Sequence, residues 1–120
     1  MAVNKVLVVD DSPTELANIR SICVDAGCTV LTASNGAEAI SKARREKPDL
    51  IFMDIIMPDM DGFEACRTLT TDAETREIPV IFITNKGQKA DRVWAQMQGG
   101  RGLVQKPYTP DQIIDQLNAV

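Results

Sequence analysis

Five side chains that could do chemistry stand at or just beyond the ends of short apolar runs. They are three carboxylates, one hydroxyl and one ammonium group, namely Asp10, Asp11, Asp54, Thr84 and Lys106. Three carboxylates that lie within a few ångströms repel one another, so protons or a cation must sit among them. Because the set offers oxygen ligands and no histidine, it favours a hard cation such as Mg²⁺.

A carboxylate beside Mg²⁺ can also act as a nucleophile toward a phosphoryl group. The metal, the lysine and the hydroxyl would then neutralise the three equatorial phosphoryl oxygens. The alternative interpretation is structural, with Asp10 and Asp11 forming only a cap and a turn before the first helix. That alternative leaves Asp54 and Lys106 unexplained, and Ser12 already supplies the cap.

Short apolar runs alternate with longer amphipathic stretches five times along the chain. The runs predict strands at Val6–Val9, Cys28–Leu31, Leu50–Met53, Val80–Ile83 and Leu103–Val104. Near-continuous apolar runs are typical of a parallel sheet that is covered on both faces. The chain of 120 residues is therefore predicted to be an α/β protein with a doubly wound, five-stranded parallel sheet and five helices. Ligands bind at the carboxyl ends of such strands, where the five polar side chains stand.

Helix start signals separate the predicted strands. Polar caps precede four helices, at Ser12, Asn35, Asp61 and Thr109. The first of them forms a capping box with Glu15. The fourth helix, near residues 88–98, carries Ala90, Val93 and Met97 at helical spacing, which predicts that these three residues face the core.

The composition excludes several classes of function. The chain has no histidine, which rules out a Ser-His-Asp mechanism, a His-ligated zinc site and a phosphohistidine relay within this chain. A net charge of −4 argues against nucleic-acid binding. The three cysteines, Cys23, Cys28 and Cys66, lack metal-ligand spacing and are expected to be reduced, mostly buried thiols. No apolar run approaches the ~18 residues of a membrane span, so we expect a soluble, cytoplasmic protein.

The polar residues and their neighbours resemble the receiver domain of two-component response regulators, the CheY-like family. The resemblance covers essentially the whole chain, with VLVVDDS at 6–12, LIFMDIIMPDMDG at 50–62, PVIFIT at 79–84 and QKP at 105–107. It is specific because four such motifs occur in register with five strand–helix units. It implies a flavodoxin-like sheet in the order 2-1-3-4-5, and a single receiver domain over residues 1–120 with no output domain.

The resemblance also implies a role for each residue of the site. Asp54 would be the phosphoacceptor, and Lys106 and Thr84 would contact the phosphoryl group. The ligands of Mg²⁺ would be Asp10, Asp11, Asp54 and the backbone carbonyl of Ile56. The Lys106–Pro107 bond would be cis, and Gly62 would allow a tight turn into the third helix.

The same resemblance implies protein partners. Since the chain lacks histidine, the phosphoryl group must come from a separate histidine kinase or a small acyl phosphate. We expect a signalling protein and not an enzyme, acting on a downstream protein through its fourth helix, fifth strand and fifth helix. The stretches DDSPTE at 10–15 and KADRVWAQMQG at 89–99 resemble the PilH-type regulators of twitching motility. That subgroup implies a role in pilus-driven or chemotaxis-type motility. From the acidic charge and the short apolar runs we expect no nucleic-acid or membrane partner.

Some residues depart from the family pattern. Leu103 stands where many receivers carry an aromatic residue, and Asn85 follows the threonine where alanine or glycine is common. Ile56 and Lys86 flank the path that a hydrolytic water would use. Because an aliphatic side chain offers this water no hydrogen bond, we predict slow self-dephosphorylation.

Three questions stay open at the level of sequence. Trp94, the only tryptophan, could pack in the core or anchor a partner protein on the fourth helix. The chain could be a pseudo-receiver, an interaction module that is never phosphorylated, although the complete acidic set argues against this. A Mg²⁺-dependent phosphatase would need a second acid beside the nucleophile, where Ile56 stands, and a substrate-selecting cap for which the chain is too short.

Overall fold

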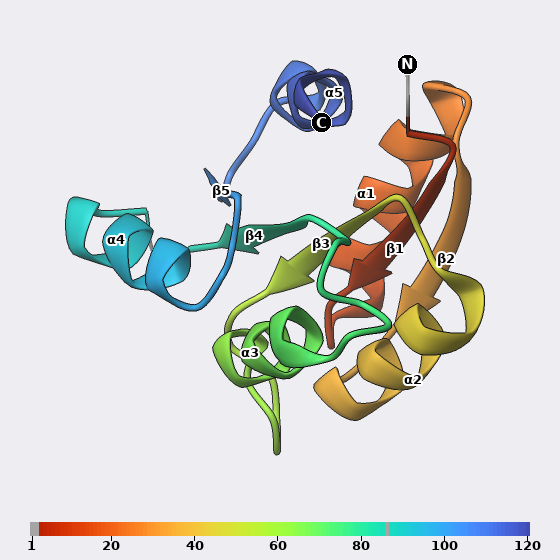
Figure 1. Ribbon diagram of the computed structural model, residues 1–120. Coiled ribbons are helices and arrows are strands. Elements are labelled where there is room, and N and C mark those ends of the chain that lie inside the picture. Colours follow the sequence, from red (N-terminus) through yellow and green to blue (C-terminus); the bar gives the residue numbers. More distant parts are fainter. Residues whose placement is uncertain (1–2, 86) are drawn as a thin grey trace.

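The fold is a five-stranded parallel sheet between two layers of helices, as seen in the computed structural model, which describes residues 3–85 and 87–120 (Figure 1). The strands are β1 Lys5–Val9, β2 Thr29–Ala33, β3 Leu50–Asp54, β4 Val80–Thr84 and β5 Gly102–Gln105. The helices are α1 Pro13–Asp25, α2 Gly36–Glu46, α3 Gly62–Thr71, α4 Lys89–Met97 and α5 Pro110–Ala119. All strand pairs are parallel and the order is β2-β1-β3-β4-β5, which confirms the predicted fold class.

Alternation along the strands sends side chains into two separate cores. In β1, Val6 and Val8 pack against α1 and α5, whereas Leu7 and Val9 pack on the opposite face against α2 and α3. This is the period of two expected of a strand, with both faces apolar because both are covered. The three cysteines are buried and free, as predicted.

The predicted caps start their helices. The side chains of Asn35, Asp61 and Thr109 each accept a hydrogen bond from a backbone amide one turn ahead. Ser12 does the same for the amide of Glu15, at 3.4 Å. These caps satisfy amides that have no partner within the helix. The cap at Ser12 also sets where α1 begins relative to Asp10 and Asp11.

Helix α4 corrects one prediction. Ala90, Val93 and Met97 do not face the core; all three are exposed, Met97 to 67%. The buried residue of the helix is Ala95. A side chain at Gly100 would lie 2.5 Å from the ring of Phe82 and 3.0 Å from the carbonyl oxygen of Ala95, so small residues make this contact between α4 and the sheet. Helical spacing identified the apolar stripe but not the direction in which it points.

Candidate functional site

The site lies at the carboxyl edge of the sheet, where the chain leaves β1 and β3. Asp10 directly follows β1, and its side chain is 2% exposed. One of its carboxylate oxygens accepts a hydrogen bond from the amide of Ser12 at 2.9 Å. Asp11 is exposed and Asp54, the last residue of β3, is half-buried.

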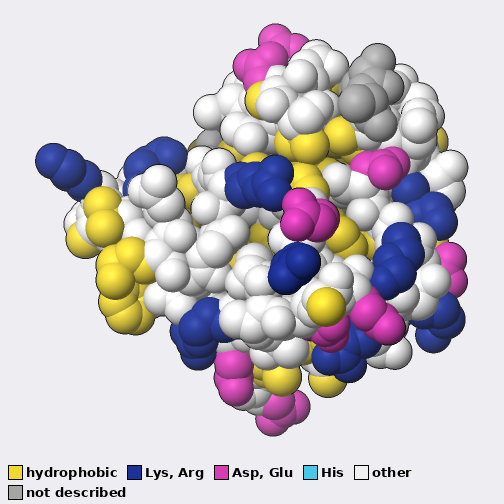
Figure 2. Space-filling model, viewed as in Figure 1, with side chains coloured by type: hydrophobic (Ala, Val, Ile, Leu, Met, Phe, Trp, Pro, Cys, Tyr) yellow, Lys and Arg dark blue, Asp and Glu magenta, His cyan; other side chains and the backbone are white. Residues whose placement is uncertain are grey.

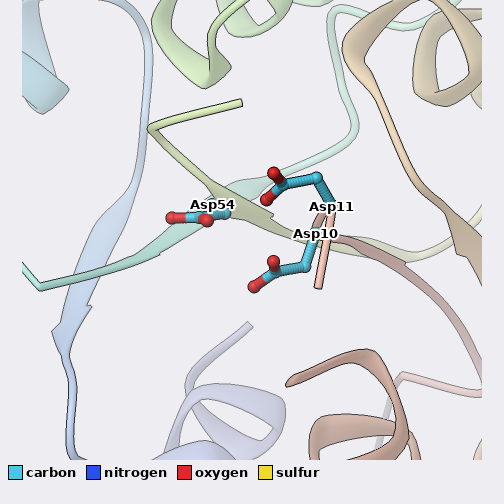
Figure 3. Close-up of side chains that lie close together, drawn as sticks. All are labelled: Asp10, Asp11 and Asp54. Atoms are coloured by element: carbon cyan, nitrogen blue, oxygen red, sulfur yellow. The ribbon is translucent and has the colours of Figure 1, made fainter. Parts of the chain in front are cut away.

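The fold brings the three predicted carboxylates together. Asp10, Asp11 and Asp54 each offer an oxygen atom, and these atoms lie within 4.8 Å of one another (Figure 3). The cluster joins two neighbouring strands, since β1 pairs directly with β3. A set of closely spaced carboxylate oxygens without sulfur or nitrogen ligands fits Mg²⁺.

Lys106 reaches the same cluster from the end of β5. Its Nζ atom lies 3.2 Å from Oδ2 of Asp10 and 3.8 Å from Oδ2 of Asp54. Its backbone amide donates to the carbonyl oxygen of Thr84 at 2.7 Å, and the Lys106–Pro107 bond is cis. The backbone therefore holds the start of this side chain beside β4 while its ammonium group lies among the carboxylates.

Glu15 is a neighbour of the site that the sequence pattern did not reveal. Its Oε2 atom lies 3.7 Å from Nζ of Lys106. The pattern around Ser12 assigned this glutamate to a capping box, but only half of the box forms. The amide of Ser12 is already engaged by Asp10, which leaves the Glu15 side chain to pair with the lysine.

Burial and charge shift the ionisation of the site. Burial, followed by the negative charge of Asp10, raises the pKa of Asp54 from 3.8 to about 6, against the opposing effect of Lys106. Burial by itself would lower the pKa of Lys106, but the carboxylates of Asp54 and Asp10 outweigh it and the net shift is upward. The lysine therefore stays cationic. Ionisation of Asp54 costs free energy in the folded protein, and a further cation at the site would reduce that cost.

The loop after Asp54 is held against the end of β3. The amide of Ile55 donates to Oδ1 of Asp54 at 2.9 Å, and the amide of Gly62 donates to the carbonyl oxygen of Ile55 at 2.7 Å. A Cβ atom at Gly62 would lie 2.2 Å from the backbone oxygen of Asp54, so only glycine fits this close approach. Ile56, within the loop, is 58% exposed.

The remaining predicted residues surround the cluster on the β4 and β5 side. Thr84 ends β4 and is buried, whereas Asn85 after it is exposed. Leu103 is buried in the core below α2, α3 and α4, paired in register with Phe82. Lys86, which the sequence places near the hydrolytic path, lies outside the described residues.

Comparison with known proteins shows the family to which this chain belongs. The family described as the response regulator receiver domain matches residues 6–118. The chain belongs to this family. Receiver domains signal through phosphorylation, and the match indicates no family of catalytic enzymes.

Similar proteins cover nearly the whole receiver domain. The chain is 46% identical to protein PilH of Pseudomonas aeruginosa, over 97% of this chain and 96% of PilH. It is 30% identical to protein PilG of the same organism, over 96% and 85% of the two chains. The solved structure of the chemotaxis protein CheY4 of Vibrio cholerae is 31% identical, with a TM-score of 0.92 and 99% coverage of both chains. Matching transcriptional regulators are longer, and this receiver domain spans 44–54% of their length.

None of the helices in the described ranges 3–85 and 87–120 has both the length and the apolar character needed to cross a membrane.

Trp94 is 49% exposed, and its ring lies 6.4 Å from that of Phe63 on α3, in an edge-to-face arrangement. The tryptophan is therefore half outside the core, and its exposed part is available for contact with another molecule.

Proposed function

We propose that Asp54 accepts a phosphoryl group from a histidine kinase or a small acyl phosphate, and that the protein signals in its phosphorylated form. The observation that carries the proposal is the meeting of Asp54 with Asp10, Asp11 and Lys106 at one edge of the sheet. A carboxylate oxygen of Asp54 attacks phosphorus. The new O–P bond forms as the P–N bond to the kinase histidine, or the P–O bond of the acyl phosphate, breaks and the electron pair leaves with the donor.

Mg²⁺ is the cofactor that we propose for this step. Its ligands would be Asp10, Asp11, Asp54 and the backbone carbonyl of Ile56. When bound, it supplies positive charge that offsets the repulsion between the carboxylates and the incoming phosphoryl oxygens. Burial, and after it the negative charge of Asp10, raises the pKa of Asp54, and a bound cation would favour the ionised form of this carboxylate.

Lys106 and Thr84 are the proposed contacts of the phosphoryl group. The ammonium group of Lys106 lies 3.8 Å from Oδ2 of Asp54, close enough to follow the charge as it passes to the phosphoryl oxygens. The hydroxyl of Thr84 would donate to one of these oxygens from the end of β4. A shift of Thr84 toward the phosphoryl group would move the loop between β4 and α4 and so change the surface that a partner recognises.

The proposed output is contact with a downstream protein, through the face formed by α4, β5 and α5. We propose a role in pilus-driven or chemotaxis-type motility. The 46% identity to PilH and the likeness to the chemotaxis protein CheY4 support it. PilH, which this chain covers almost completely, also supports a function carried by the receiver domain alone, over residues 1–120.

Intact-mass spectrometry tests the proposed chemistry. The protein is incubated with a small acyl phosphate, with Mg²⁺ or with a chelator, beside the variants Asp54→Asn and Asp59→Asn. Asp59 is an exposed carboxylate in the following loop, and its positive φ of 68° is a conformation that asparagine tolerates. We expect one phosphoryl group on the wild type and on Asp59→Asn, only with Mg²⁺, and none on Asp54→Asn.

The other outcomes identify the alternatives. A folded wild type that gains no phosphoryl group, from the acyl phosphate or from a phosphorylated kinase, would indicate a pseudo-receiver. A phosphoryl group that persists on Asp54→Asn would place the acceptor elsewhere.

A further inference from the structure

The ammonium group of Lys106 lies between the start of α1 and the end of β3. Its Nζ atom is 3.7 Å from Oε2 of Glu15, on α1, and 3.8 Å from Oδ2 of Asp54, on β3. Both distances are longer than a hydrogen bond, whereas Nζ donates to Oδ2 of Asp10 at 3.2 Å. Glu15 and Asp54 therefore attract the same cation from nearly equal distances, and neither holds it closely.

The position of the Glu15 carboxylate follows from the local structure of α1. Glu15 is the third residue of the helix, where the glutamate of a capping box turns back to the amide of the N-cap residue. Here that amide, of Ser12, donates to Oδ1 of Asp10 at 2.9 Å. The other oxygen of Asp10 accepts the hydrogen bond from Lys106. Because Asp10 takes the place of Glu15 in the cap, the glutamate is available to the lysine.

The two competing carboxylates differ in exposure. The side chain of Glu15 is 35% exposed, whereas that of Asp54 is 12% exposed. Water can solvate Glu15 when the ammonium group moves away, so loss of this contact costs little free energy. The attraction to Asp54 is screened less by water and salt, and it grows when phosphoryl oxygens add negative charge there. Glu15 is therefore the partner that Lys106 can leave.

Other contacts hold the chain around Lys106 in place without Glu15. The backbone amide of Lys106 donates to the carbonyl oxygen of Thr84 at 2.7 Å. One turn further along α1, Nδ2 of Asn18 donates to the hydroxyl oxygen of Tyr108 at 3.0 Å. Loss of the Glu15 carboxylate should therefore release only the ammonium group, which can then move toward the end of β3.

We propose that Glu15 is a positioning residue, which holds the ammonium group of Lys106 toward α1 and so competes with the phosphoryl group on Asp54. This inference rests on the proposed function. Before transfer, the contact keeps the positive charge of the lysine away from Asp54. During transfer, the lysine leaves Glu15 to reach the phosphoryl oxygens. An ion pair this exposed limits the gain in rate on its removal to about fivefold.

Loss of a negative charge could also act at a distance, because the phosphodonor is an anion. Figure 2 shows Lys and Arg side chains intermixed with Asp and Glu over the face of the molecule drawn there. Charges of opposite sign partly cancel at long range and are screened by salt. We therefore expect the contact with Lys106 to outweigh the distant effect, and the variants below separate the two.

Phosphorylation rates test the proposal, measured by intact mass at saturating Mg²⁺ with a small acyl phosphate as donor. Glu15→Gln should accelerate phosphorylation by about threefold to fivefold. Glu15→Asp keeps the negative charge but withdraws it from the lysine by one methylene, so it should give nearly the same gain.

The matched control is Glu38→Gln. Glu38 is also the third residue of its helix, α2, and it also pairs with a lysine, Lys42, at 3.2 Å. Its side chain is 39% exposed, close to the 35% of Glu15. Because Glu38 has no contact with Lys106, we expect Glu38→Gln to leave the rate unchanged.

Lys106→Met removes the cation for which Glu15 and Asp54 compete. In that background Glu15→Gln should leave the slow rate unchanged. An equal gain with and without the lysine, or a gain in Glu15→Gln but not in Glu15→Asp, would show an effect of charge at a distance and overturn the positioning role. An unchanged or slower rate in Glu15→Gln would overturn it as well.

Urea unfolding with a chelator and no phosphodonor tests the contact by itself. Glu15→Gln should lower the urea midpoint more in the wild type than in Lys106→Met, and equal shifts would overturn the proposal. A wild type that accepts no phosphoryl group would overturn the proposed function and the competition together. An unchanged rate in Glu15→Gln, beside a wild type that is phosphorylated, would overturn the competition alone.

Discussion

At the carboxyl edge of the sheet, ionisable side chains are buried, whereas on the outer surface of α4 apolar side chains are exposed. Asp10 and Lys106 have side chains that are 2% and 12% exposed, and they form an ion pair at 3.2 Å. Val93 and Met97, on the outward side of α4, are 49% and 67% exposed. Each region thus reverses the usual partition of residue types, in which charges face water and apolar groups are buried.

The two reversals have different physical costs. Burial of charge requires partners, and the site supplies them, because one lysine lies among three carboxylates. Exposure of apolar groups costs a folded domain little, but it leaves a surface that another molecule can cover. The comparison teaches that the ionisation of the edge is set by charges within the chain, whereas the outward side chains of α4 are left largely to solvent.

The largest expected effect comes from Lys106→Met. Removal of the cation leaves Asp10 buried without its ion pair, so we expect the free energy of unfolding to fall by about 3 kcal/mol in urea titrations. The rate of phosphorylation should fall on the order of 10²-fold. The matched control is Lys42→Met, which removes a partly exposed helical pair with Glu38, worth less than ~1 kcal/mol, and a hydrogen bond to the carbonyl oxygen of Thr32. An equal loss of unfolding free energy in both variants would show that the buried ion pair at the edge contributes no more to stability than the pair on the helix surface.

Asp54→Asn should stabilise the metal-free protein. The pKa of Asp54 is about 6 in the folded state against 3.8 ordinarily, so the folded protein disfavours its ionised form. The free energy of unfolding of the wild type therefore falls as the pH rises from about 4 to about 6. Asp54→Asn does not lose this free energy, so at neutral pH it should be the more stable protein by on the order of 2 kcal/mol.

Urea unfolding in the presence of a chelator measures this effect at acidic and neutral pH. The advantage of Asp54→Asn should be small near pH 4 and constant above about pH 7, while Asp59→Asn should show no such trend. An advantage that is independent of pH would argue against repulsion at the site.

Ile56→Asn should shorten the life of the phosphorylated form. An amide at this exposed position could hold a hydrolytic water by one hydrogen bond, which an isoleucine cannot. One such bond, worth about 1.4 kcal/mol in the transition state, corresponds to a tenfold faster loss of the phosphoryl group. Intact mass followed over time measures the half-life, with Ile56→Val as the aliphatic control. An unchanged half-life in Ile56→Asn would remove the idea that this side chain slows hydrolysis.

The smallest expected effect is on the outward surface of α4. Val93→Ser and Met97→Ser should each change the free energy of unfolding by less than ~0.5 kcal/mol, because neither side chain is buried. Leu103→Ala, in the adjoining core, should cost about 2–3 kcal/mol. Quenching of Trp94 fluorescence by iodide gives an independent check and should be efficient. A tryptophan that iodide does not quench, or losses of about 2–3 kcal/mol in the Val93 and Met97 variants, would mean that this face of α4 is turned toward the core.

Much of the fold follows from the sequence. Five apolar runs and four polar caps were enough to predict the strands, the starts of most helices and the covered parallel sheet. The edge of the sheet followed in turn, because residues after parallel strands meet at one edge whatever their distance along the chain. The observed cluster of Asp10, Asp11 and Asp54 is the result of this topology.

Other features depend on competition between partners, which spacing alone does not reveal. The pattern around Ser12 assigned Glu15 to a capping box, but Asp10 takes the amide and Glu15 pairs with Lys106 instead. The stripe of α4 has the spacing of a core face, yet Ala95 makes the contact with the sheet. Both outcomes are decided by tertiary packing, since the local pattern is compatible with either arrangement.

The most direct test of the account is to locate the phosphoryl group on the chain. The protein is phosphorylated with a small acyl phosphate and Mg²⁺, reduced with borohydride so that an aspartyl phosphate becomes homoserine, and sequenced by tandem mass spectrometry. The account predicts homoserine at position 54 alone, with Asp10 and Asp11 unchanged. Homoserine at either of those two positions, or at none, would contradict it.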